Sequence, residues 1–214
     1  MIGGERAARD FVAGLAQSDA AALSRLDRLA ELLAAENQRQ NLVSAASLEE
    51  MWLRHIADSA QLLAHVSRET DSWLDLGTGA GFPGLVIACL LPETRVLLVE
   101  SRARRIAWLR EASEVLGLRN ASVLGQRLEL VDTPPVSVIS ARAFAPLDKL
   151  LRLSARFSTA DTLWLLPKGR SARQELHELT GWDHSFHVEQ SLTDAQAGII
   201  VGTLAETGRN RPAN

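Results

Sequence analysis

The chain has 214 residues, 46% of them hydrophobic and 23% charged, which is enough for one α/β domain with a modest extension but cramped for two domains. No apolar run approaches the length of a membrane span and the start lacks a signal-peptide core, so we expect a cytoplasmic protein. Cys89 is the only cysteine, which excludes an internal disulfide and a cysteine zinc site, and the histidine spacing predicts no metal site.

The net charge of −3 conceals an uneven distribution. Residues 102–173 hold 13 basic and 6 acidic residues, whereas residues 1–101 hold 8 and 14. A basic segment in an acidic chain is typical of a face that binds nucleic-acid phosphates, although solvated helix faces would give the same count. If this segment binds nucleic acid, Arg105, Lys168 and Arg170 are the expected phosphate ligands.

Residues 1–66 are predicted to form a helical cap. Apolar periodicity indicates a helix over residues 5–40, and a break follows at Asn41. Residues 47–50 have the form of a capping box that starts a second helix. In that helix Arg54 and Asp58 are four residues apart, a spacing that also fits a simple surface ion pair.

The stretch from Trp73 to residue 84 reads as a buried strand, a glycine-rich turn and a helix. Without a Cβ, the turn's glycines let the backbone approach a ligand closely, and Pro83 suits the first turn of a helix. A second strand over residues 95–99 completes a βαβ unit. The turn is therefore the expected cofactor site, and its candidate ligands are Gly77, Gly79, Gly81 and Phe82.

Two carboxylates suggest which cofactor binds there. Glu100 ends the second strand about 20 residues beyond the glycines, the spacing at which such units place an acid on ribose hydroxyls. Residues 79–84 also match the G-x-G-x-x-G dinucleotide pattern, so NAD is a candidate. Asp75, however, lies at the entrance of the turn, where it would repel a pyrophosphate and attract the cationic groups of S-adenosylmethionine. The acids favour the methyl donor.

The remaining elements alternate as a mostly parallel sheet requires. Helices are expected over 101–116, 146–157 and 171–179, and strands over 121–124, 136–140, 162–166, 185–190 and 198–204. Leu128 and Glu129 follow the third strand, Arg142 the fourth and Lys168 the fifth, so all four should meet at the carboxyl edge of the sheet. The predicted domain covers 67–206, and 207–214 should be a mobile tail.

These motifs together resemble one family, the bacterial small-subunit ribosomal RNA methyltransferase G, also called glucose-inhibited division protein B. The resemblance covers roughly residues 37–205 and depends on the loop at 75–84, Glu100 and the segments 41–44, 54–59 and 140–145. It implies a class I S-adenosylmethionine-dependent methyltransferase fold, Rossmann-like with an N-terminal helical extension. It also implies methylation of N7 of a guanine in the decoding-region loop of 16S rRNA.

By motif match, the donor contacts would fall on Gly77, Phe82, Leu128, Glu129 and Arg142. Guanine N7 carries a lone pair and no proton, so attack needs no general base, and Arg142 and Lys168 would act mainly by positioning. Asn41 and His55 are expected at the entrance for the guanine. The expected partner is 16S rRNA in the small subunit or an assembly intermediate, and the expected state is a monomer.

Three other functions stay open from the sequence. An NAD-dependent oxidoreductase would share the glycine pattern. A non-catalytic rRNA-binding assembly factor would retain the fold without methyl transfer. A methyltransferase for a small molecule would lack the steep salt dependence of binding through phosphates.

Overall fold

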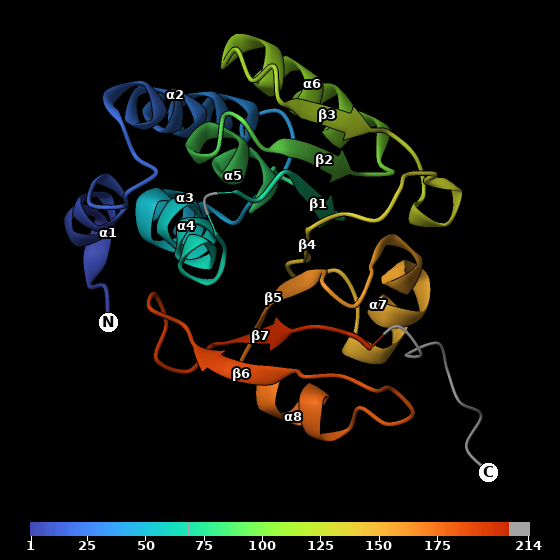
Figure 1. The fold of residues 1–214 in the computed structure, drawn as a ribbon. Helices are drawn as coiled ribbons and strands as arrows, with labels where there is room; N and C mark the ends of the chain where they lie inside the picture. The colour runs from blue at the N-terminus through green and yellow to red at the C-terminus, as the bar shows by residue number, and fades with distance from the viewer. Residues whose placement is uncertain (68, 206–214) are drawn as a thin grey trace.

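The computed structural model describes residues 1–67 and 69–205, which form one seven-stranded sheet with helices on both faces (Figure 1). The strand order is β3-β2-β1-β4-β5-β7-β6, and only β7 runs antiparallel to its neighbours. The strands are β1 (Ser72–Leu76), β2 (Arg95–Val99), β3 (Ala121–Leu124), β4 (Val138–Ser140), β5 (Leu163–Gly169), β6 (His187–Gln190) and β7 (Gly198–Gly202).

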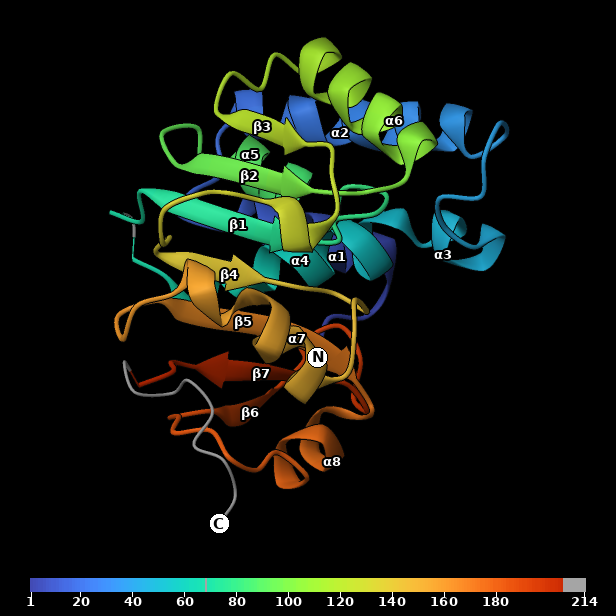
Figure 2. The same cartoon turned by 90° about the vertical axis from the view of Figure 1, so that its right-hand side faces the viewer.

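Twelve helical segments are present among the described residues, several of them a single turn. They are α1 (Gly4–Ala13), α2 (Ala20–Glu36), α3 (Ala45–Glu49), the π-helical η1 (Trp52–Ala57), α4 (Asp58–Ala60), η2 (Gln61–His65), α5 (Gly84–Leu90), α6 (Ala103–Val115), η3 (Leu128–Leu130), α7 (Leu147–Ser154), η4 (Ala155–Phe157) and α8 (Ala172–His177). In Figure 2 the arrows of β1, β2 and β4 point to one edge of the sheet, and α3 lies at that edge.

Alternate residues of the strands enter two separate cores, as the period of two in a strand requires. Trp73, Val96 and Leu98 pack with α5, α6 and the N-terminal helices on one face. Leu74, Leu97 and Val99 pack with α7 and η4 on the other. Because the N-terminal helices share the first core, they are built onto the sheet.

The predicted helix over 5–40 is wrong in one respect, since it is two helices. Gly14 ends α1 by donating its N–H to the carbonyls of Asp10 and Phe11, and the Asp19 carboxylate caps α2 through the N–H of Ala22 at 2.6 Å. The predicted capping box is also wrong, because Ser44 caps α3 through the N–H of Ser47 at 3.2 Å. The predicted boundary at residue 66 falls between η2 and β1 and stays a prediction.

The strands over 95–99 and 121–124 are confirmed at their predicted bounds. The strand β5 runs three residues beyond its predicted end, because its pairing with β7 continues to Gly169. The predicted tail, 207–214, lies outside the described residues. Within the described ranges, no helix is long and apolar enough to cross a membrane.

Gly84 begins α5 at a point where a side chain has no room. A Cβ there would lie inside van der Waals contact with Leu98 Cδ2 and 2.8 Å from Asp75 Oδ2. We expect Gly84→Ala to lower the free energy of unfolding by about 1–3 kcal/mol through overpacking, measured by urea denaturation. Gly3→Ala is the control, because nothing lies within 4 Å of a Cβ at Gly3. Equal stabilities of the two variants would contradict this packing.

Candidate active site

The Asp75 carboxylate lies at the end of β1 and is fully buried. It accepts hydrogen bonds from the Ser140 hydroxyl at 2.7 Å, from the N–H of Gly84 at 3.0 Å and from the Thr78 hydroxyl. Burial raises the pKa of Asp75 to about 6, and the three hydrogen bonds oppose that rise. At neutral pH this carboxylate is an anion that ties together the glycine turn, β4 and α5.

The expectation that Asp75 presents its charge to a bound cation is therefore wrong for this structure. The side chain has no exposed surface, and three groups of the protein itself occupy its oxygens. Buried carboxylates require such partners, and a strand followed by a tight turn supplies them locally. In this structure Asp75 holds the turn against α5 and β4.

A cavity of about 220 Å³ opens beside the turn, and we call it the smaller cavity. Among the predicted site residues it is lined by Gly77, Glu100, Leu128 and Arg105. The Glu100 carboxylate, 5% exposed, accepts the N–H groups of Ser101 and Arg102 on Oε1 at 2.7 and 2.9 Å. Its Oε2 lies 3.8 Å from Arg105 Nη1, so this oxygen is free to accept a hydroxyl.

Six of the predicted cofactor ligands do not line the smaller cavity, namely Asp75, Gly79, Gly81, Phe82, Glu129 and Arg142. Gly79 and Gly81 lie in the turn with φ of 60° and 108°, where they shape the backbone. Phe82 is buried and stacks on His55 with 4.9 Å between ring centroids. Glu129 is exposed on η3. Arg105, predicted to bind RNA, instead lies on the cofactor side beside Glu100.

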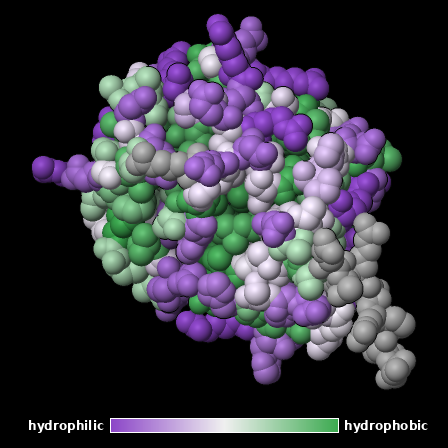
Figure 3. All heavy atoms as spheres, viewed as in Figure 1, coloured by the Kyte–Doolittle hydropathy of each residue, from purple (hydrophilic) through white to green (hydrophobic). Residues whose placement is uncertain are grey.

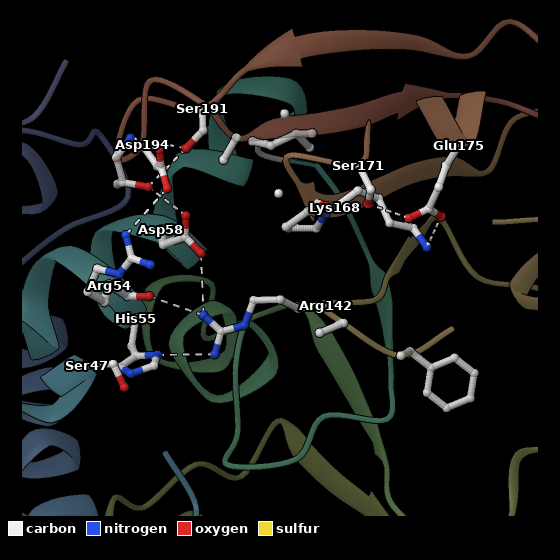
Figure 4. Close-up of a pocket in the computed structure, with 18 of the residues that line it drawn as sticks. Ser47, Arg54, His55, Asp58, Arg142, Lys168, Ser171, Glu175, Ser191 and Asp194 are labelled. Carbon is white, nitrogen blue, oxygen red and sulfur yellow. Dashed lines mark hydrogen bonds and ion pairs between the residues drawn. The ribbon is translucent and has the colours of Figure 1, made fainter. Parts of the chain in front are cut away.

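A second cavity of about 650 Å³, the larger cavity, lies between η1, the ends of β4 and β5 and the β6–β7 loop (Figure 4). Arg142 points into it. Its Nη1 lies 3.4 Å from Asp58 Oδ2 and donates to the Arg54 carbonyl at 3.3 Å, and its Nη2 lies 3.2 Å from His55 Nδ1. Burial lowers the pKa of Arg142, and the Asp58 carboxylate opposes that shift.

Arg54 and Asp58 have other partners, so the surface ion pair that their spacing allows is not formed. Asp58 pairs with Arg142, which comes from β4 far along the chain, and Arg54 faces Asp194 at 3.6 Å. Figure 4 shows Arg54 below Asp194, and the Arg142 guanidinium between Asp58 and His55. The fourth strand thus brings its arginine to the face of the helix that carries both residues.

His55 is a neutral group in this arrangement. Because the Arg142 guanidinium can only donate, His55 Nδ1 accepts and Nε2 carries the proton. That Nε2 is buried without a hydrogen-bond partner among the described residues. Burial and the neighbouring arginines lower the pKa of His55 to about 3.

Lys168 lines the larger cavity, but its ammonium group is already paired with groups of the protein. Its predicted roles in positioning the substrate and binding phosphate stay predictions. Its side chain is 5% exposed, and Nζ lies 2.9 Å from Glu175 Oε2 and donates to the Ala145 carbonyl. It thus holds the segment after β4 against α8. Arg170 is exposed at the carboxyl end of β5, and Asn41 is exposed beside a separate hollow lined by residues between 37 and 49.

Ala143 and Phe144 line both cavities, so the two adjoin across this segment. Ala143 has a φ of 50°, which is rare for a residue with a Cβ. The Phe144 ring lies over Gly77, where a Cβ would collide with it. A group bound in the smaller cavity would therefore face the larger one past Phe144.

Sequence reasoning missed the residues that complete the site, namely Thr78, Ser140, Phe144 and Asp194. Ser140 could have been found from the sequence, because it ends a predicted strand and β4 pairs with the strand that ends near Asp75. Asp194 could not have been found from the sequence, because its position depends on the conformation of the loop between the last two strands.

Similar solved structures share the fold. A cofactor-bound protein from MTB has a TM-score of 0.67 at 15% identity, over 97% of this chain and 100% of that one. A SAM-dependent methyltransferase from Aquifex aeolicus has a TM-score of 0.55 at 16% identity, over 69% of this chain and 89% of that one. The strand order with one antiparallel strand is that of the class I methyltransferase fold.

Sequence comparison defines the family. A family model described as rRNA small subunit methyltransferase G matches residues 22–196. The ribosomal RNA small subunit methyltransferase G of Erythrobacter litoralis is 60% identical over 94% of this chain and 97% of its own length. The chain belongs to the rRNA small subunit methyltransferase G family, which confirms the predicted resemblance and fold class.

Two substitutions separate a structural Asp75 from one that attracts the ligand by charge. Asp75→Ala removes the acceptor of three donors, so we expect a loss of about 2–5 kcal/mol in unfolding free energy and at least a ~10-fold loss of S-adenosylmethionine affinity by calorimetry. Asp75→Asn keeps an oxygen for Gly84 and Thr78 and should recover most of both. Equal losses of affinity in the two variants would show instead that Asp75 attracts the ligand by its charge.

The neutral His55 predicts a pH-dependent stability. Its folded pKa of about 3 lies below the ordinary value of 6.5, so stability is lost as the pH falls below 6.5. The contribution from pH 7.5 to 5 is about 2 kcal/mol, measured as the difference in urea denaturation between the native chain and His55→Asn. The raised pKa of Asp75 has the opposite effect, because its protonation stabilises the fold as the pH falls below about 6. Both proteins contain Asp75, so its contribution cancels in the difference. Parallel stability curves for His55→Asn and the native chain would contradict a buried neutral imidazole.

Proposed function

We propose that this protein transfers the methyl group of S-adenosylmethionine to N7 of a guanine in the decoding-region loop of 16S rRNA. The observation that carries the proposal is the adjoining pair of cavities at the carboxyl edge of the sheet, one beside Glu100 and one around Arg142. Membership of the family supports small-subunit rRNA as the substrate.

The smaller cavity would hold the adenosine of the donor. Glu100 Oε2 would accept the ribose hydroxyls, Leu128 would cover the adenine, and the glycine at 77 would allow close approach of the backbone. S-adenosylmethionine supplies an electrophilic methyl group when it is bound there. NAD is disfavoured, because the chain belongs to a methyltransferase family.

The larger cavity would receive the guanine. N7 has a lone pair in the ring plane and no proton, so the residues around it have to orient the base and exclude water. Arg142 is fixed by Asp58, His55 and the Arg54 carbonyl, and a fixed guanidinium can position a base or its phosphate without moving. Lys168 contributes by holding the 143–146 segment in place.

The phosphates of the RNA would meet the arginines outside the cavities. Arg102, Arg104 and Arg127 are exposed around the start of α6 and after β3, close to the smaller cavity. Figure 3 shows hydrophilic residues over α6 and around α8, with hydrophobic surface between them. Phosphate contacts of this kind fix register and carry no sequence information. Asn41 and Arg170, on either side, remain candidates for the same surface.

The target guanine must leave its stack to enter the larger cavity, which costs least in a loop. We therefore propose the small subunit or an assembly intermediate as partner, a monomeric enzyme, and action in the cytoplasm. The cap over residues 1–66 would serve as one wall of the guanine site, since it supplies His55 and Asp58.

Labelled methyl transfer tests the proposal. Unmodified 30S subunits incubated with the protein and labelled S-adenosylmethionine should acquire label at a guanine N7 of 16S rRNA, mapped by cleavage at the methylated base. Glu100→Gln should lower kcat/KM by about 10- to 100-fold, because a charged hydrogen bond to the ribose is lost. Glu111→Gln on the exposed face of α6 is the matched control.

Raising the salt concentration should weaken transfer to RNA steeply, because counterions compete for the phosphate contacts. Label in a small-molecule pool with a flat salt response would point to a small-molecule enzyme. Donor binding without label in any RNA would leave the non-catalytic assembly factor.

A further inference from the structure

The larger cavity contains three carboxylates among the described residues, and two of them are already occupied. Asp58 Oδ1 accepts from Gln61 Nε2 at 2.9 Å and from Thr193 Oγ1 at 2.7 Å, while its Oδ2 faces Arg142. Glu175 accepts from Ser171, from the N–H of Leu147 and from Lys168. Each oxygen of these two carboxylates accepts at least one hydrogen bond from the protein.

Asp194 differs from both. Its Oδ1 accepts only the N–H of Gln196, at 2.9 Å, and its Oδ2 lies 3.6 Å from Arg54 Nη1, beyond hydrogen-bond length. The side chain is 31% exposed and lines the larger cavity. This carboxylate has unfilled acceptor positions facing the space that the proposed function assigns to the base.

The loop that carries Asp194 is fixed to the helical cap. Thr193 donates to Asp58, and the N–H of Leu192 donates to Gln61 Oε1 at 2.7 Å. Ser191 also lies within hydrogen-bond distance of Gln61, at 3.4 Å. Figure 4 shows Asp194 above Arg54 on the side of the cavity opposite Lys168. A carboxylate held in this way can select a ligand by shape as well as by charge.

We infer that Asp194 reads the Watson–Crick edge of the target guanine, accepting hydrogen bonds from its N1–H and its 2-amino group. This inference rests on the proposed function and adds a specificity residue to it. Guanine presents two adjacent donors on that edge, which match one carboxylate. Adenine presents an acceptor at N1 and no donor at C2, so it would meet the carboxylate with repulsion.

The same contact favours the reaction. When N7 takes the methyl group and the sulfonium charge is lost, positive charge spreads over the purine, and the N1 proton becomes more acidic. A hydrogen bond from N1–H to a carboxylate therefore strengthens as the transition state forms. Asp194 would raise kcat as well as select the base.

The test compares guanosine with inosine at the target position in reconstituted 30S subunits, since inosine keeps N7 and lacks only the 2-amino group. The native protein should methylate inosine with a kcat/KM about 10-fold below that for guanosine. Asp194→Asn should lower kcat/KM on guanosine by about 10- to 100-fold and reduce the guanosine-to-inosine ratio to within about 3-fold of one. Asp161→Asn, on an exposed turn, is the control.

A purely structural role for Asp194 would lower the rates on both bases equally and leave their ratio unchanged, which would overturn the inference. Native activity of Asp194→Asn on guanosine, or indifference of the native protein to inosine, would also overturn it while leaving the methyltransferase intact. Absence of label from the native protein on any 16S rRNA would overturn the proposed function and this inference together.

Discussion

The hydrogen bonds of the buried Asp75 carboxylate are the interaction on which the site depends. One side chain joins the end of β1 to the glycine turn, to the first residue of α5 and to the end of β4. Burial of an anion is unfavourable unless donors surround it, and here the donors come from three elements that must all be in place. The turn, the neighbouring strand and the helix therefore adopt one relative arrangement.

That arrangement determines where the functional side chains lie. Ser140 binds Asp75, and two residues later the chain carries Arg142 into the larger cavity. The cap closes the cavity from the other side, because His55 and Asp58 meet Arg142, and Gln61 anchors the loop that carries Asp194. The N-terminal helical segments thus build one wall of the larger cavity, and their fixed position follows from the core they share with the sheet.

The βαβ unit, the carboxyl-edge location and the place of Glu100 could be predicted from the sequence, because periodicity, glycine spacing and strand polarity are local properties. Side-chain partners could not. Lys168 and Asp58 are paired with Glu175 and Arg142, and these pairings depend on strand order and loop packing. The role of Asp75 could not be predicted either. Its position at the end of a strand is the same whether the side chain faces the ligand or supports the turn. Desolvation decides between these roles, and it is a property of the folded chain.

The most direct test of this account is a crystal structure with S-adenosylhomocysteine bound. The account predicts the adenosine in the smaller cavity, with ribose hydroxyls on Glu100 and the sulfur directed past Phe144 toward Arg142, while Asp75 keeps its three protein donors. Adenosine bound elsewhere, or an Asp75 carboxylate in contact with the ligand's amino group, would contradict the account.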